Sequence, residues 1–345
     1  MTRVARWMRR LAIAGVLLCL IVVSLGAYVR LTAAGLGCPD WPGCYGHLTP
    51  SGGDAANAPE AIAGRPYEAG KAWREMIHRY AAATLGLTIV LIAALALTTR
   101  REQRLSAPLP LALFAIVVVQ GLLGMLTVTW QLKPLVVTLH LLFGMTTLAL
   151  LMWLALSLPR GSWEATARAG PARAQSGGAA DLAGARRLVR LGLAALAVQI
   201  ALGGWTSSNY AAVACPDFPT CRGAWWPAAD FRDAFVLWRG LNIDYEGGAL
   251  AASARIAIHL THRLGALVTA LALTLAALAV LRRRGLAAAR VRAWAVLAAL
   301  ALQLTIGISM VEKGFPLWLA TAHTAGAALL LLATLALLRS LGASR

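Results

Sequence analysis

Long apolar runs dominate the chain, and short polar segments separate them. A helix needs about twenty apolar residues to cross roughly 30 Å of hydrocarbon. Runs of about this length predict eight membrane-spanning helices, near residues 11–29, 80–98, 108–129, 136–157, 188–206, 255–281, 291–311 and 317–338. The first run follows a basic start, as in a secretory signal peptide. It is long enough to span and has no clear small-residue cleavage site before the next loop, so we interpret it as a retained helix.

Composition supports the same interpretation. The 345 residues are 59% hydrophobic and only 13% charged, which leaves too little polar surface to cover a soluble globule. The net charge of +18 could suggest nucleic acid as a partner, but the basic residues cluster at the ends of the apolar runs. In a membrane protein such clusters mark the cytoplasmic side. We therefore expect an all-α integral membrane protein with membrane lipid as its solvent and no nucleic-acid partner.

The basic clusters give an orientation. With eight spans they all fall on one side, at Arg3, Arg6, Arg9, Arg10, Arg100, Arg101, Arg104, Arg282, Arg283, Arg284 and Arg345. This predicts a multi-pass protein of the bacterial cell (inner) membrane with both termini in the cytoplasm. The long loops at 30–76 and 207–253 then face outward.

The second half of the sequence repeats the first. The segment from Cys38 to Cys44 matches Cys215 to Cys221 at an offset of 177 residues, and the matched histidines below share offsets of 183 and 184. Because each copy contains an even number of spans, both copies enter the membrane in the same direction. We expect two tandem four-helix bundles related by a pseudo-twofold axis along the membrane normal. Their predicted bounds are 1–157 and 188–345, with a cytoplasmic linker at 158–187.

Four of the six histidines form two matched pairs. His78 and His140 begin the second and fourth spans, and His262 and His323 do so in the second copy. Imidazole is costly to bury in lipid without a partner, so a histidine within a span is a candidate functional residue. Two imidazoles that face each other across a bundle suit the axial positions of a heme iron. A structural hydrogen bond is the alternative for a lone histidine, but repetition of both pairs favours heme.

A carboxylate accompanies only one of the pairs. Glu75 precedes His78 by three residues, which puts both side chains on one face of a helix. The matching residue before His262 is His259. Oxidation at a porphyrin edge needs a group that takes protons or orients water, whereas an electron carrier does not. We therefore predict chemistry in the first copy, with Glu75 as the catalytic residue, unless Glu75 merely pairs with a neighbouring arginine.

Four of the five cysteines form two loops of identical spacing on the side assigned as outside. An even number of cysteines in an oxidising compartment predicts two disulfides, Cys38 to Cys44 and Cys215 to Cys221. They either staple each loop or have a redox role. Cys19 lies alone in the first span and is interpreted as a small apolar residue.

These residues together resemble the heme A synthases of bacteria and mitochondria over the whole chain. The motifs that carry the resemblance are Arg30-Leu31-Thr32, Glu75-Met76-Ile77-His78-Arg79, Thr138-Leu139-His140, Thr261-His262-Arg263, Ala322-His323 and the paired cysteines of the bacterial type. One departure is Ala34, where the family often has Ser.

The resemblance implies an enzyme that oxidises a ring methyl group of heme O to a formyl group through successive hydroxylations, giving heme A. It implies that His78 and His140 ligate the substrate heme, that His262 and His323 ligate heme B, and that Glu75 is the catalytic glutamate. Heme O synthase and terminal oxidase assembly factors are the implied partners, and a homo-oligomer stays open. The competing interpretation is a diheme cytochrome b type electron carrier, which the four histidines alone support equally well.

Overall fold

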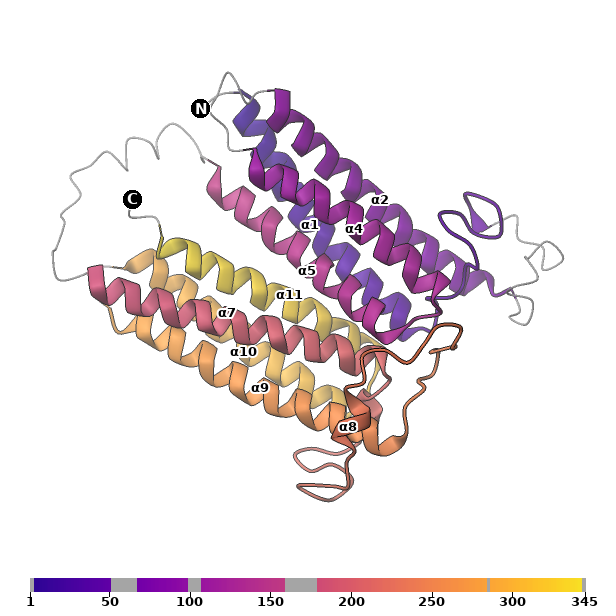
Figure 1. The fold of residues 1–345 in the computed structure, drawn as a ribbon. Coiled ribbons are helices and arrows are strands. Elements are labelled where there is room, and N and C mark those ends of the chain that lie inside the picture. The colour runs from indigo at the N-terminus through magenta and orange to yellow at the C-terminus, as the bar shows by residue number, and fades with distance from the viewer. Residues whose placement is uncertain (1–2, 51–66, 99–106, 159–178, 284–285, 343–345) are drawn as a thin grey trace.

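The computed structural model describes residues 3–50, 67–98, 107–158, 179–283 and 286–342, and its long elements are all helices (Figure 1). Eight helices in these ranges are long and apolar enough to cross a membrane. They are α1 (Arg3–Leu31), α2 (Ala69–Thr98), α4 (Pro108–Thr129), α5 (Pro134–Ser157), α7 (Ala179–Ser208), α9 (Ala252–Leu281), α10 (Ala287–Glu312) and α11 (Leu317–Ser340). The loop between α7 and α9 adds two short helices, η4 (Ala212–Ala214) and α8 (Phe231–Ala234). The predicted all-helical membrane class is confirmed.

Several helices begin earlier than the apolar runs do. Helix α2 begins at Ala69 instead of residue 80, and α7 begins at Ala179, inside the segment expected to be linker. The added turns of α2 carry Lys71 and Arg74, which end an apolar run but are good helix formers. Hydropathy therefore locates the hydrocarbon-crossing part of a helix, and the helix itself continues beyond it. The linker residues 159–178 and the basic residues 100, 101, 104, 284 and 345 lie outside the described ranges.

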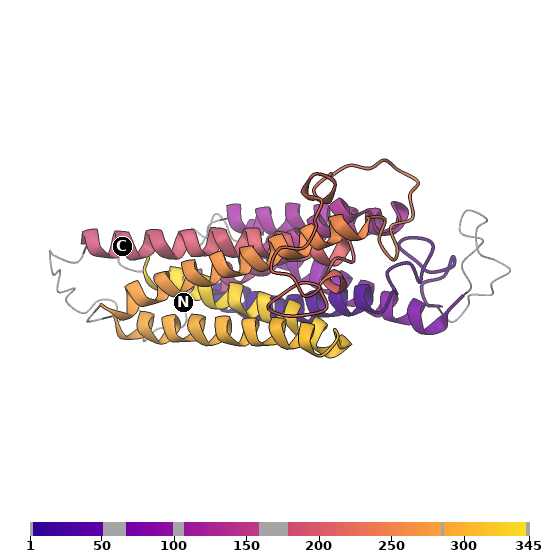
Figure 2. The same ribbon diagram turned by 90° about the horizontal axis from the view of Figure 1, so that it is seen from below.

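The helices pack in two groups of four. Helices α1 and α4 each contact α2 and α5, while α7 contacts α9 and α11, and α10 contacts the same two helices. Between the groups, α1 contacts α11, and α5 contacts both α7 and α11. The two groups lie side by side in both ribbon views (Figures 1 and 2). One apolar cluster is continuous through both groups and includes Ile89, Leu148, Leu273 and Leu330.

The two ends of the helix assembly differ. The beginning of α1 and the end of α11 lie at one end, and the long loops that carry the cysteines lie at the other (Figures 1 and 2). All four histidines of the predicted pairs lie in the loop-side portions of their helices. The cysteine loops and the histidines therefore share one end of the protein.

Two cations from the first group contact the second group at this loop end. Lys133, in the turn between α4 and α5, is almost fully buried; its Nζ donates to the Gly240 carbonyl at 2.5 Å and lies 3.0 Å from the centre of the Trp238 ring. Arg30, at the end of α1, stacks on Tyr210 with its Cζ 3.9 Å from the ring centre. Both cations belong to the first half of the chain, and all of these partners belong to the second.

Candidate functional site

Both cysteine loops close as the spacing predicts. The Sγ atoms of Cys38 and Cys44 are bonded at 2.02 Å, and those of Cys215 and Cys221 at 2.00 Å. All four cysteines are buried against the first turns of α2 and α9. Each loop also contains a cis peptide bond before its second proline. The matched sequences thus fold into matched loops.

An aspartate organises the turn in each loop. The Asp40 carboxylate accepts hydrogen bonds from two backbone N–H groups five and six residues later, at 2.6 and 2.8 Å. Asp217 does the same at 2.5 and 2.9 Å and also accepts from the Thr220 hydroxyl at 2.5 Å. The Thr220 hydroxyl and these N–H groups stabilise the anion, so the pKa of Asp217 falls from its ordinary 3.8 to about 2.

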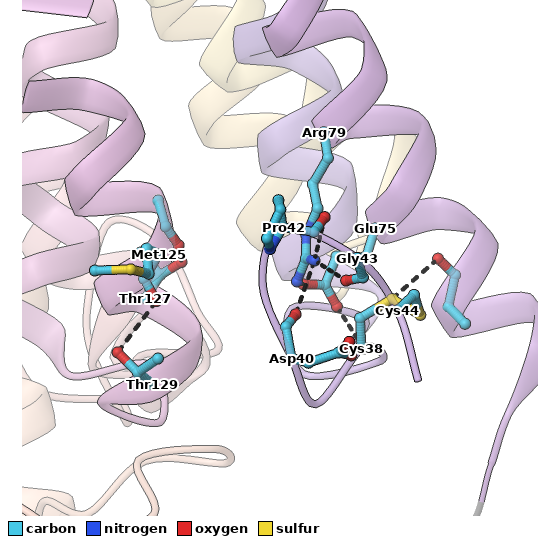
Figure 3. Close-up of polar contacts among 12 residues, drawn as sticks. Cys38, Asp40, Pro42, Gly43, Cys44, Glu75, Arg79, Met125, Thr127 and Thr129 are labelled. Carbon is cyan, nitrogen blue, oxygen red and sulfur yellow. Dashed lines mark hydrogen bonds and ion pairs between the residues drawn. A yellow bond between two sulfur atoms is a disulfide. The ribbon is translucent and has the colours of Figure 1, made fainter. Parts of the chain in front are cut away.

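Glu75 joins the first cysteine loop to α2. Its side chain is only 5% exposed, and Oε2 accepts a hydrogen bond from the Cys38 backbone N–H at 2.8 Å. Oε1 lies 2.5 Å from Arg79 Nη2, one helical turn further along α2 (Figure 3). A buried carboxylate is retained only where it is paired and hydrogen-bonded, and here both oxygens have donors. Glu75 is thus held between the helix and the disulfide loop.

The second copy lacks this arrangement. His259 takes the position of Glu75 and is likewise buried, but its Nδ1 has no hydrogen-bond partner among the described residues. Arg263 takes the position of Arg79 and bonds only to carbonyl groups of its loop. The two copies therefore differ at the carboxylate and agree in the contact between arginine and loop.

Three of the four histidines lie deeper in their helices than the apolar runs predicted. His78 is nine residues after the start of α2, and His262 is ten after the start of α9, which is between two and three turns. His140 and His323 are each six residues from the starts of α5 and α11. His78 was expected to begin its span and lies inside α2, because helical turns that carry Lys71 and Arg74 precede the apolar run. His262 was also expected to begin its span and lies inside α9.

A glycine on a neighbouring helix makes room for each of these rings. A Cβ atom would lie 3.0 Å from His78 at Gly26, 3.3 Å from His140 at Gly124, 3.2 Å from His262 at Gly203 and 2.9 Å from His323 at Gly307. The glycines match across the copies at offsets of 177 and 183 residues. Each imidazole therefore packs against the glycine backbone and occupies space that a side chain at that position would need.

The rings of the second pair, His262 and His323, lie close to each other. The ring centres of His262 and His323 are 6.4 Å apart, and the ring planes make an angle of 74°. Imidazoles that bind one metal ion from opposite sides are separated by two bonds of about 2 Å each and by the distance from nitrogen to ring centre on both sides. The observed separation agrees with this sum.

Glutamine amides flank three of the histidines. The side-chain nitrogens of Gln120, Gln199 and Gln303 donate to the backbone carbonyls of His140, His262 and His323 at 2.9 to 3.0 Å. The Gln199 amide also lies 3.1 Å from His262 Nδ1. In the first pair, Nδ1 of both His78 and His140 is buried without a partner among the described residues. The rings of the first pair are therefore less constrained by side chains than those of the second.

Arg79 and the matched glycines are functional candidates to which the sequence patterns assigned no role. The signal was available, because these glycines lie within membrane helices and recur at the offsets of the cysteine loops and of His140 and His323. What the sequence could not give was the ring each glycine faces, since this depends on helix packing.

Known proteins resemble the chain over most of its length. The model of the cytochrome oxidase assembly protein family COX15-CtaA matches residues 9–335. A protein named heme A synthase from Shewanella oneidensis is 42% identical over 91% of this chain and 90% of its own length. Another of that name from Sphingopyxis alaskensis is 30% identical over 98% of this chain and 92% of its own length. The residues matched by the family model include both histidine pairs and both cysteine loops.

Proposed function

Because the chain belongs to the cytochrome oxidase assembly protein family COX15-CtaA, we propose that it is a heme A synthase, an oxidoreductase that converts heme O to heme A. The single observation that carries the proposal beyond the family is the asymmetry of the two histidine pairs. Both pairs have the same glycine-lined surroundings, but only the first has a buried carboxylate one turn away. Substrate oxidation then belongs to the first copy and electron transfer to the second.

The second copy fits a resident heme B. The ring centres of His262 and His323 are 6.4 Å apart, and these two residues would hold the heme iron; Gly203 and Gly307 leave room for their rings. When bound, such a heme supplies reversible one-electron transfer. The Gln199 amide lies beside the His262 ring and donates to the His262 backbone carbonyl, which restricts the ring from one side.

The first copy fits the substrate. His78 and His140 would hold the iron of heme O, and the absence of side-chain partners at Nδ1 suits a heme that must enter and leave. With both histidines bound to it, that iron would have no position left for oxygen. We therefore place the oxidation at the porphyrin edge.

Glu75 is the residue we assign to proton transfer. Conversion of a methyl to a formyl group with water as the oxygen source releases four protons and four electrons, and the electrons would pass one at a time to an external one-electron acceptor. Glu75 is buried and lies three residues before His78 on α2, and a positioned carboxylate can take protons or orient the attacking water. Isotope labelling tests this route: formyl oxygen from water supports it, and formyl oxygen from dioxygen refutes it.

The architecture proposed with this function is two tandem four-helix bundles, 1–157 and 188–345, related by a pseudo-twofold axis along the membrane normal. Both termini would lie in the cytoplasm of a bacterial cell, with the cysteine loops outside the inner membrane. The disulfides support this orientation, because they persist in an oxidising compartment. Heme O synthase and terminal oxidase assembly factors are the proposed partners, since one supplies the substrate and the others receive the product.

The test is to express the chain together with a heme O synthase, extract the hemes and separate them chromatographically. We expect heme A and a hydroxylated intermediate, both lost in Glu75→Gln while heme B stays bound. His259→Gln is the matched control, because it changes the corresponding residue of the second copy, and it should keep turnover. Bound heme B with untouched heme O in the wild-type chain would refute the proposal and favour a diheme cytochrome b type carrier.

A further inference from the structure

Arg79 makes two kinds of contact at once. Its Nη2 lies 2.5 Å from Glu75 Oε1, and its Nη1 donates to the carbonyl oxygens of Asp40 at 2.9 Å and Gly43 at 2.5 Å (Figure 3). One side of the guanidinium therefore faces the carboxylate, and the other is inserted into the cysteine loop. The Arg79 side chain is only 13% exposed, so water screens these contacts weakly.

In the second copy the arginine contacts the cysteine loop without a bonded carboxylate. Arg263 donates to the carbonyl oxygens of Asp217 at 2.7 Å and Thr220 at 2.7 Å, which are the contacts that Arg79 makes in its own loop. Among the described residues no carboxylate is hydrogen-bonded to the Arg263 side chain: His259 stands where Glu75 would be, and the Asp217 carboxylate interacts with Arg263 without an ion-pair contact. Binding to the loop is thus common to both arginines, and the contact with a carboxylate is found at Arg79.

The fork geometry explains why arginine is suited to this position. A guanidinium is planar and carries donors on both edges, so it can bind a carboxylate and two carbonyl groups without moving. A lysine ammonium is a single point at the end of a flexible chain, and it cannot occupy both places. Together with the Cys38 N–H on Oε2, Arg79 fixes Glu75 at both oxygens.

We propose that Arg79 is a positioning residue for the oxidation: it holds the Glu75 carboxylate in one orientation and links it to the backbone of the Cys38–Cys44 loop. The role rests on the proposed function of Glu75, and it assigns Arg79 no contact with substrate. The loop, the arginine and the carboxylate then move as one unit, and the first copy differs from the second in having the carboxylate within that unit.

The test compares Arg79→Lys and Arg79→Gln with Arg263→Lys and Arg263→Gln in the full-length, purified chain. Turnover of heme O is measured as kcat and KM, normalised to bound heme B from the reduced spectrum. Because a displacement of about 1 Å at a reacting group can cost about a hundredfold in rate, we expect kcat to fall by about that factor in Arg79→Lys with KM unchanged. The Arg263 variants should keep the wild-type kcat.

A second readout does not depend on turnover. Carbodiimide labels accessible carboxylates, and peptide mass mapping gives the labelled fraction of Glu75 and the state of both disulfides. We expect Glu75 labelling to increase in Arg79→Lys and to stay at the wild-type level in Arg263→Lys, with both disulfides intact. This readout tests the role of Arg79 even if the wild-type chain makes no heme A, which would refute the proposed function alone.

Three results would overturn the inference. The first is a wild-type kcat in Arg79→Lys. The second is an equal loss of kcat in the Arg79 and Arg263 variants, since that would show that Arg79 only stabilises its cysteine loop, as Arg263 does. The third is unchanged labelling of Glu75 in both Arg79 variants.

Discussion

The glycine against His323 offers the sharpest test of the ligand assignment. In Gly307→Ala, the new methyl group would lie 2.9 Å from His323 Cε1, whereas ordinary contact begins at 3.4 Å. The ring must therefore retreat by about half an ångström, but a metal–ligand bond tolerates only about 0.2 Å. Either the bond weakens or the helices move apart.

The cost follows from two opposing effects. Overpacking costs about 1–3 kcal/mol, and replacing Gly by Ala in a helix returns about 0.5–1 kcal/mol. A net loss of about 1–2 kcal/mol corresponds to heme binding that is about 5- to 30-fold weaker. The measurement is a titration of heme B into heme-depleted protein, followed by the reduced-minus-oxidised spectrum.

Two other glycines serve as controls. A Cβ atom at Gly86 of α2 or Gly121 of α4 would meet nothing within 4 Å, so alanine at either position should leave heme binding unchanged. Wild-type affinity in Gly307→Ala would refute the reasoning, because it would mean that the His323 ring does not hold the heme in the orientation described. Equal weakening in all three variants would point to a general effect on the helices and refute it as well.

Three more predictions follow from contacts outside the histidine pairs. Because the pKa of Asp217 is about 2 in the folded loop and 3.8 ordinarily, its contribution to loop stability is complete above about pH 4 and is lost as the pH falls towards 2; the protection of the Arg222 amide, measured as its exchange rate relative to an unstructured peptide at the same pH, should fall over that range and stay constant in Asp217→Asn. Lys133→Met removes a charged hydrogen bond of about 1.5–3 kcal/mol, so the midpoint of thermal unfolding in detergent should fall, and an unchanged midpoint would show that the contact contributes nothing. Cys38→Ser should lower turnover more than Cys215→Ser does, because only the first loop donates to Glu75; equal losses in heme A formation would contradict this.

Hydropathy and repetition predicted most of the fold. Eight apolar runs identified the eight helices because crossing hydrocarbon demands length and apolar character whatever the tertiary packing. The same criterion misplaced helix starts, as at Ala69 and Ala179, since a helix that leaves the bilayer can carry charges. Helix ends outside the membrane depend on local contacts that hydropathy does not see.

The candidate site was predicted in part. Matched spacing was enough to pair the cysteines, and the three-residue interval put Glu75 and His78 on one face of α2. The hydrogen bond from Cys38 to Glu75 spans 37 residues and depends on how the loop folds back on the helix. No sequence pattern singled out Lys133, and its burial under Trp238 follows from a long loop of the other copy, which no periodicity indicates.

Arg30 has a consequence for which chains can pair. Its guanidinium donates to the carbonyl oxygens of Ser207 and Ser208 at 3.0 and 3.4 Å, and Ser207 is the residue that matches Arg30 in the repeat. The second half has no arginine at the matching position to make the same contact in return, so the interface between the halves is not symmetric. If two N-terminal halves met along it, each arginine would face another cation, and like charges would repel. Halves produced as separate polypeptides should therefore assemble with each other and reject their own kind.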